Sequence, residues 1–220
     1  MITVFPEGAM QLAKKTTLKM ADIVTESIQT SQSYLHSRDS EDYDVVMQLE
    51  EMVNKLDTEI TSYLLKIMKQ SGNSADVAET YTKTLEIVKN YERMSDLSTN
   101  LVELYNMTVE GRETFSEEAM EDIDTMYKLL LDMLHRSMKI YQNEDSAGYE
   151  LLLQDEEYMD LIEDKYREKH FRRLADGICD TKFASSVFVD VLSTLERIAD
   201  HGVNVARNVN SAVKMHSSGH

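Results

Sequence analysis

One nine-residue motif occurs twice in this sequence. Residues 92–100 read Glu-Arg-Met-Ser-Asp-Leu-Ser-Thr-Asn, and residues 196–204 read Glu-Arg-Ile-Ala-Asp-His-Gly-Val-Asn. Glu, Arg, Asp and Asn recur at the same four places, 104 residues further on. An offset of this size divides a chain of 220 residues into two similar halves. We therefore expect a duplicated unit, with one copy in residues 1–110 and the other in residues 111–220.

The composition favours helices. The chain has 7 glycines and a single proline, Pro6, whereas Leu, Met, Glu, Lys and Ala are plentiful. Few helix breakers and long stretches of helical periodicity predict an all-α fold. We expect six helices. The first starts at residues 5–8 and ends at 37. The next four cover residues 41–69, 75–109, 116–141 and 147–174, and the sixth begins at residue 180 or 181 and ends at 215. Three long helices in each half predict two tandem antiparallel three-helix bundles.

Polar residues at two of the breaks predict where helices begin. Ser40 is expected to cap the second helix, because two acidic residues follow it. Thr114 and Glu117 have the spacing of a capping box before the fourth helix.

A net charge of −17 restricts the partners of this chain. It disfavours nucleic acid, which needs a basic surface, and direct capture of free phosphate, but it permits metal cations and basic protein surfaces. No apolar run approaches the ~20 residues that a transmembrane helix needs, and no signal peptide is visible. Cys179 is the single cysteine, which excludes an internal disulfide and fits a reducing compartment. We expect a cytoplasmic protein that binds no nucleic acid.

The acidic residues of the motif lie on apolar helix faces. Each helical residue advances about 100°, so Glu92 and Asp96 lie about 40° apart, as do Glu196 and Asp200. Apolar side chains project within about 40° of them in both copies: Leu85, Val88, Val189, Leu192 and Val203. Like charges at this spacing destabilise a helix by roughly 0.2–0.5 kcal/mol, and a buried carboxylate needs a cation or a raised pKa. The motif therefore raises the question of which positive charge it meets.

The preceding helix of each half supplies further acids. In the second half, Asp160 and Asp164 lie one turn apart, and Glu156 precedes them by another turn. In the first half, Asp57 lies on the apolar face, but Val53 occupies the place where a second acid would complete the pair. We therefore expect a full set of carboxylates in the second half and an incomplete set in the first.

Carboxylate oxygens are the ligands of hard cations such as Mg²⁺, Ca²⁺, Mn²⁺ or Fe³⁺. The same spacing also suits solvated acidic faces, or acids paired with Arg93 and Arg197, which stand beside them. The residues alone leave both interpretations open.

The motif Glu-Arg-x-x-Asp-x-x-x-Asn, present twice in a chain of six helices, resembles the PhoU family of phosphate-transport regulators. This resemblance implies two three-helix bundles with metal ions at paired acids, whether an iron cluster, Mn or Mg. The implied metal ligands are Asp57, Glu92, Asp96, Asp160, Asp164, Glu196 and Asp200, and Val53 departs from the family pattern. Residues 5–15 and 164–173 look like the cytoplasmic C-terminal PhoU-like domain of sodium/phosphate cotransporters.

The resemblance further implies a non-catalytic regulatory domain of phosphate uptake at the inner face of the membrane. Its partner would be the membrane portion of a transporter, in the same chain or in another protein, and a homodimer is compatible with such long helices. A free-standing PhoU-like regulator is the alternative. Two rivals are a metal-free helical adaptor and a di-iron carboxylate enzyme. The enzyme would need two Glu-x-x-His motifs, and the sequence has none; Asp132 and His135 offer the closest spacing.

Overall fold

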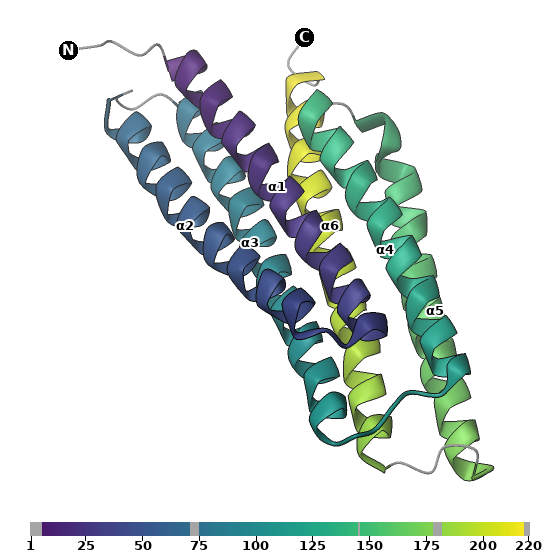
Figure 1. Cartoon of the computed structure of the whole chain (residues 1–220). Coiled ribbons are helices and arrows are strands. Elements are labelled where there is room, and N and C mark those ends of the chain that lie inside the picture. The colour runs from purple at the N-terminus through teal and green to yellow at the C-terminus, as the bar shows by residue number, and fades with distance from the viewer. Residues whose placement is uncertain (1–5, 71–74, 145, 178–181, 218–220) are drawn as a thin grey trace.

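The computed structural model describes residues 6–70, 75–144, 146–177 and 182–217 (Figure 1). This part is all helical: α1 (Pro6–Ser37), α2 (Ser40–Gln70), α3 (Ala75–Glu110), α4 (Glu117–Asn143), a 3-10 turn η1 (Ser146–Gly148), α5 (Tyr149–Ala175) and α6 (Lys182–Ser217). The predicted all-α fold with six long helices is confirmed, and the helix ends lie within about two residues of those expected. The expected start of the sixth helix at residue 180 or 181, and Cys179, lie outside the described residues.

The helices form two groups of three that share one core. Helices α1, α2 and α3 pack on one another, as do α4, α5 and α6, and α3 lies along α6 where the two groups meet (Figure 1). The buried apolar residues of all six helices belong to a single cluster. The turn between α3 and α4 contains the predicted boundary at 110/111, which stays a prediction because the two groups are packed together.

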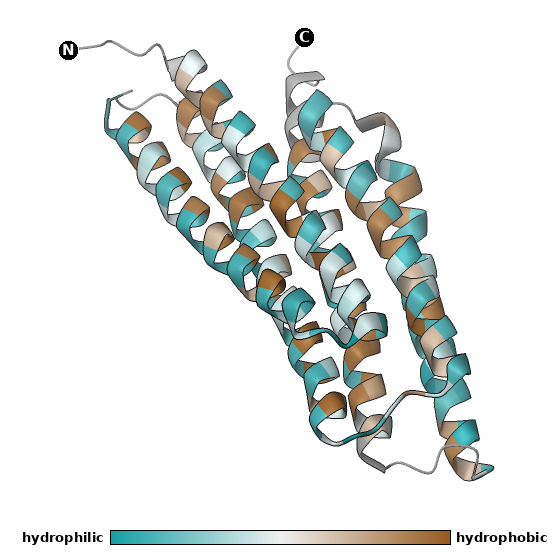
Figure 2. Ribbon diagram, in the orientation of Figure 1, coloured by the Kyte–Doolittle hydropathy of each residue, from teal (hydrophilic) through white to brown (hydrophobic). Residues whose placement is uncertain are grey.

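Amphipathic periodicity produces this packing. Hydrophobic and hydrophilic residues alternate around each helix (Figure 2), as a helix with one buried face requires. Burying one large aliphatic side chain contributes about 1.5–3 kcal/mol. In α2 the buried residues recur at helical spacing: Val46, Leu49, Val53, Ile60, Leu64 and Ile67. Among the described helices, none is long and apolar enough to cross a membrane.

The capping residues differ from those expected. The side chain of Asp39, not Ser40, accepts a hydrogen bond at 3.0 Å from the second backbone N–H of α2, and Ser40 is already helical. Ser116, not Thr114, caps α4 by accepting a backbone N–H at 3.2 Å. Both predictions were wrong because several polar residues follow one another at each break, and only the backbone path decides which one reaches the free N–H groups.

Buried hydrogen bonds fix the two groups of helices against each other. The hydroxyl of Tyr127 in α4 lies 2.9 Å from the hydroxyls of Ser31 in α1 and Tyr105 in α3. The side chains of His201 in α6 and Asn90 in α3 are joined by a 2.9 Å hydrogen bond. Because these contacts cross from one half to the other, they hold the acidic residues of α3 and α6 in a defined relation.

Candidate metal centre

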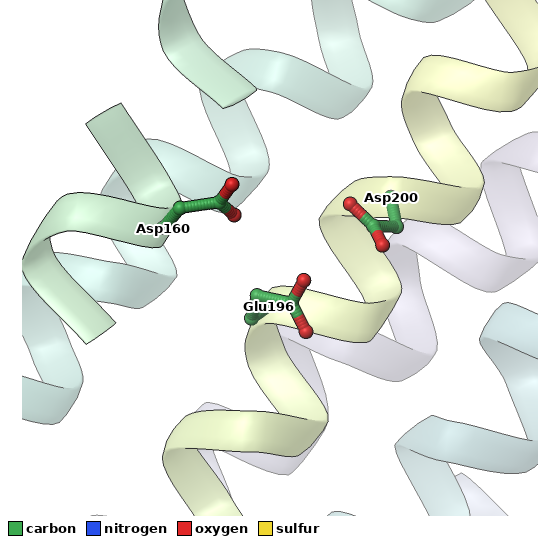
Figure 3. A group of neighbouring side chains, drawn as sticks. All are labelled: Asp160, Glu196 and Asp200. Carbon is green, nitrogen blue, oxygen red and sulfur yellow. The ribbon is translucent and has the colours of Figure 1, made fainter. Parts of the chain in front are cut away.

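Three predicted ligands from two helices come together in the second half of the chain. Asp160 of α5 points toward α6, where Glu196 and Asp200 lie one turn apart (Figure 3). One carboxylate oxygen from each of the three lies within 4.8 Å of the other two. Asp160 is exposed, and Glu196 and Asp200 are half-buried, so the cluster opens to solvent along one side.

The geometry of this cluster fits one hard cation. Oxygen–metal distances are about 2.0–2.6 Å for Mg²⁺ and Ca²⁺, so two oxygens that share an ion can be at most about 4–5 Å apart. The three oxygens satisfy this limit without movement of the backbone. All of the donors are carboxylates, and this donor set suits the hard cations predicted from the sequence.

The carboxylates of the cluster repel one another. Burial, followed by the charges of Asp200 and Asp160, raises the pKa of Glu196 from 4.5 to about 7. Partial burial and the same kind of repulsion, from Asp200 and Asp164, also raise the pKa of Asp160. A group of acids that resists full ionisation is one that a cation would stabilise strongly.

Glu156 lies near this cluster, and the predicted ligand set did not include it. It lies one turn before Asp160 on α5, and burial raises its pKa, with further contributions from Asp200 and Asp160. Arg207 of α6 lies 3.8 Å from its carboxylate and offsets part of this effect. The sequence did show Glu156 one turn from Asp160, but it offered no reason to prefer Glu156 over Asp164.

Asp164 lies beyond this group. It is exposed, and within the described residues it does not belong to the set of acids that are close enough to share an ion. Its charge still raises the pKa of Asp160. Among the described residues, neither Asp164 nor Glu156 belongs to the group of three carboxylates with ligand spacing.

The predicted ligands of the first half lie in a different environment. Asp57 of α2 accepts a hydrogen bond at 2.7 Å from Lys89 of α3, with which it forms an ion pair. Burial raises the pKa of Glu92, and Asp96 raises it further, whereas Lys89 lowers it. In the part of the chain that the structure describes, these three acids do not form a cluster with ligand spacing. Val53, the expected position of a second acid, is fully buried in the core.

The whole structure thus defines a class of protein. It has two packed three-helix units, and a carboxylate cluster lies between α5 and α6 of the second unit. The PhoU domain model matches this chain twice, at residues 17–105 and 123–209. The chain belongs to the PhoU domain family.

Individual relatives agree with this assignment. The chain is 23% identical over 205 residues to the candidate inorganic phosphate export protein YjbB of Salmonella typhimurium, covering 93% of this chain but 37% of that protein. It is 23% identical over 203 residues to a Thermotoga maritima protein named PhoU homolog 1, an accessory protein of phosphate-specific transport, covering 92% and 86% of the two chains. The crystal structure of PhoU from Pseudomonas aeruginosa superposes with a TM-score of 0.85 at 17% identity, over 94% of this chain and 98% of that one. This last similarity shows the shared fold.

Proposed function

We propose that this chain is a non-catalytic PhoU-type regulator of phosphate transport that binds a hard metal cation between α5 and α6. Membership of the family and the names of its relatives support the regulatory role. The observation that carries the metal site is the carboxylate cluster of Asp160, Glu196 and Asp200, with ligand oxygens within 4.8 Å. Glu156 is the fourth ligand that we infer.

The residues of this site have distinct tasks. Glu196 and Asp200 project from one face of α6, and Asp160 points toward them from α5, so both helices contribute ligands. A bound cation supplies the positive charge that cancels their repulsion, and it thereby strengthens the contact between α5 and α6. In its absence, Glu196 keeps a proton up to about pH 7. Binding a cation near neutral pH therefore releases that proton.

Metal analysis tests this proposal. Protein purified without chelator should contain Fe, Mn or Mg, and its melting temperature should rise when the stripped protein receives Mn²⁺. At a metal concentration 100 times the Kd the gain is about 2.7 kcal/mol, or roughly 5–10 °C. The double variant with Glu196→Gln and Asp200→Asn should lose this response. Glu121→Gln, on the exposed face of α4, should retain it. A wild-type protein without metal and with an unchanged melting temperature would instead favour the metal-free adaptor.

The relatives favour a free-standing regulator. The PhoU homolog of Thermotoga maritima and the PhoU structure from Pseudomonas aeruginosa are matched over 86% and 98% of their lengths. A regulator of this kind would act at the cytoplasmic face of the membrane, through contact with a transporter in another protein.

A second candidate is the cytoplasmic domain of a longer phosphate transporter. The specific observation in its favour is the match to 37% of YjbB. A sodium/phosphate cotransporter would be one such protein. Immunoblotting of native cell fractions separates the two: a band near 25 kDa, the mass of this chain, supports the free-standing regulator, and a much larger band in the membrane fraction supports the transporter domain.

A further inference from the structure

Lys89 and Ser193 occupy the same place in the two copies of the repeat. Each stands three residues before the glutamate that opens the duplicated motif. Each also reaches across to the preceding helix: Lys89 Nζ donates to Asp57 at 2.7 Å, and Ser193 Oγ donates to Glu163 at 3.1 Å. Asp57 of α2 and Glu163 of α5 are therefore equivalent positions, so the first half has an ammonium where the second half has a hydroxyl.

This equivalence fixes the register between α2 and α5, and it corrects the alignment expected from the sequence, which set Val53 in the place of Asp160. Asp160 lies three residues before Glu163, and the residue three before Asp57 is Asn54. Glu156 lies seven residues before Glu163, and the corresponding residue of α2 is Glu50. The first half thus has an amide in the place of the ligand Asp160, and the side chain of Asn54 donates a hydrogen bond to Glu50. The first half has one carboxylate fewer and one ammonium more.

The electrostatics of the two motif glutamates follow this difference. The charge of Lys89 lowers the pKa of Glu92 and so offsets part of the effect of burial and of Asp96. The neighbours of Glu196 all raise its pKa. In the second half Arg167 donates to Ser193 at 3.0 Å and is ion-paired with Glu163, so a guanidinium lies beside that acid. The two halves therefore differ in geometry: Lys89 lies 2.7 Å from Asp57 in the first half, whereas three carboxylates with ligand spacing converge in the second.

We propose that the ammonium of Lys89 is the resident cation of the first bundle, and that it takes the place of a metal ion there. The chain then binds metal in the second bundle alone. This inference rests on the metal site proposed above and adds an asymmetry to it. Metal availability changes the contact between α5 and α6, while the contact between α2 and α3 is independent of metal.

Mn²⁺ binding tests the exclusion of metal from the first bundle. In the variant with Glu196→Gln and Asp200→Asn, only the acids of the first bundle remain intact, and we expect no stoichiometric Mn²⁺ after gel filtration. Adding Lys89→Ser and Asn54→Asp to this variant gives the first bundle the residues of the second, and Mn²⁺ binding should return at about one ion per chain. Retention of Mn²⁺ by the first variant, or no gain in the folded second variant, would overturn the inference.

The reciprocal change tests the same idea in the second bundle. Ser193→Lys in the otherwise wild-type chain should weaken Mn²⁺ binding at least about 10-fold, because an ammonium beside Glu196 competes with the ion. Ser186→Lys, on the exposed face of α6, adds the same charge away from the site and should leave the affinity unchanged. Equal affinities of the Ser193→Lys variant and the wild type would count against a resident ammonium.

A metal-free measurement separates this inference from the proposed function. Lys89→Ser should lower the melting temperature of chelator-treated protein by about 2–4 °C, because it removes the ion-pair partner of Asp57. Lys83→Ser removes a lysine whose ion pair with Glu79 is within one helix, and it should have a smaller effect. If the wild type binds no Mn²⁺ but Lys89→Ser still destabilises the protein, the proposed metal site is refuted and the role of Lys89 as a resident cation is supported. An unchanged melting temperature for Lys89→Ser excludes the resident cation.

Discussion

The raised pKa of Glu196 makes the metal-free protein sensitive to pH in a defined direction. The pKa rises from 4.5 to about 7 in the folded chain. Between these values the folded protein keeps a proton that the unfolded chain has released, so the free energy of unfolding falls as the pH rises from about 4.5 to 7. Without solvent screening, this pKa shift corresponds to roughly 3 kcal/mol in the free energy of unfolding. Screening of a half-buried group reduces the contribution to about 1–2 kcal/mol.

Glu196→Gln removes this ionisation. Because Gln resembles the protonated acid, the variant and the wild type should be equally stable near pH 5 in chelator, and the variant should melt about 3–6 °C higher at pH 8. Thermal unfolding followed by circular dichroism at both pH values measures the difference, with Glu121→Gln as the control. Added Mn²⁺ should reverse the order, since only the wild type gains from the ion. Equal melting temperatures at pH 8 in chelator, or a destabilised variant, would refute the electrostatic reasoning.

Three further substitutions probe the scaffold. Tyr127→Phe leaves the buried hydroxyl of Tyr105 without its bond across the two halves and should cost about 1–2 kcal/mol in urea unfolding. Asp122→Asn removes the negative charge that lies 3.0 Å from the buried Arg173 and should cost about 3–5 kcal/mol by the same measurement. Asp39→Ala removes the cap of α2 and should lower the melting temperature by about 2–4 °C, for a loss of about 1 kcal/mol.

Matched controls separate these effects from the loss of polar atoms in general. Tyr158→Phe removes an exposed tyrosine hydroxyl and should be neutral. Ser40→Ala should have little effect, because Ser40 is helical and Asp39 supplies the cap. If Ser40→Ala proves as damaging as Asp39→Ala, the assignment of the cap is wrong. If Asp122→Asn costs less than about 1 kcal/mol, Arg173 finds its compensation elsewhere.

The fold was predictable because it depends on signals that repeat along the chain. Each helix carries an apolar stripe over many turns, so errors at single residues cancel, and the ends of the helices follow from clusters of polar residues and glycine. The caps at Asp39 and Ser116 show the limit of this approach. Composition shows that a helix begins within a few residues, but the hydrogen bond is decided by the local backbone.

The carboxylate cluster was predictable only in part, because helical periodicity identifies the face of a helix on which a residue lies, but not which residues of two packed helices lie at the same level. Glu156, Asp160 and Asp164 succeed one another at intervals of one turn, so all three project toward α6. Which of them lies close to Glu196 and Asp200 depends on how far α5 is shifted along α6, and that shift is set by core packing. The repeat contains information on this register of α5 against α6, because Lys89 and Ser193 both lie three residues before a motif glutamate. These two residues reveal the register only when their hydrogen-bond partners on α2 and α5 are known. The contacts with these partners show which residue of α2 corresponds to which residue of α5.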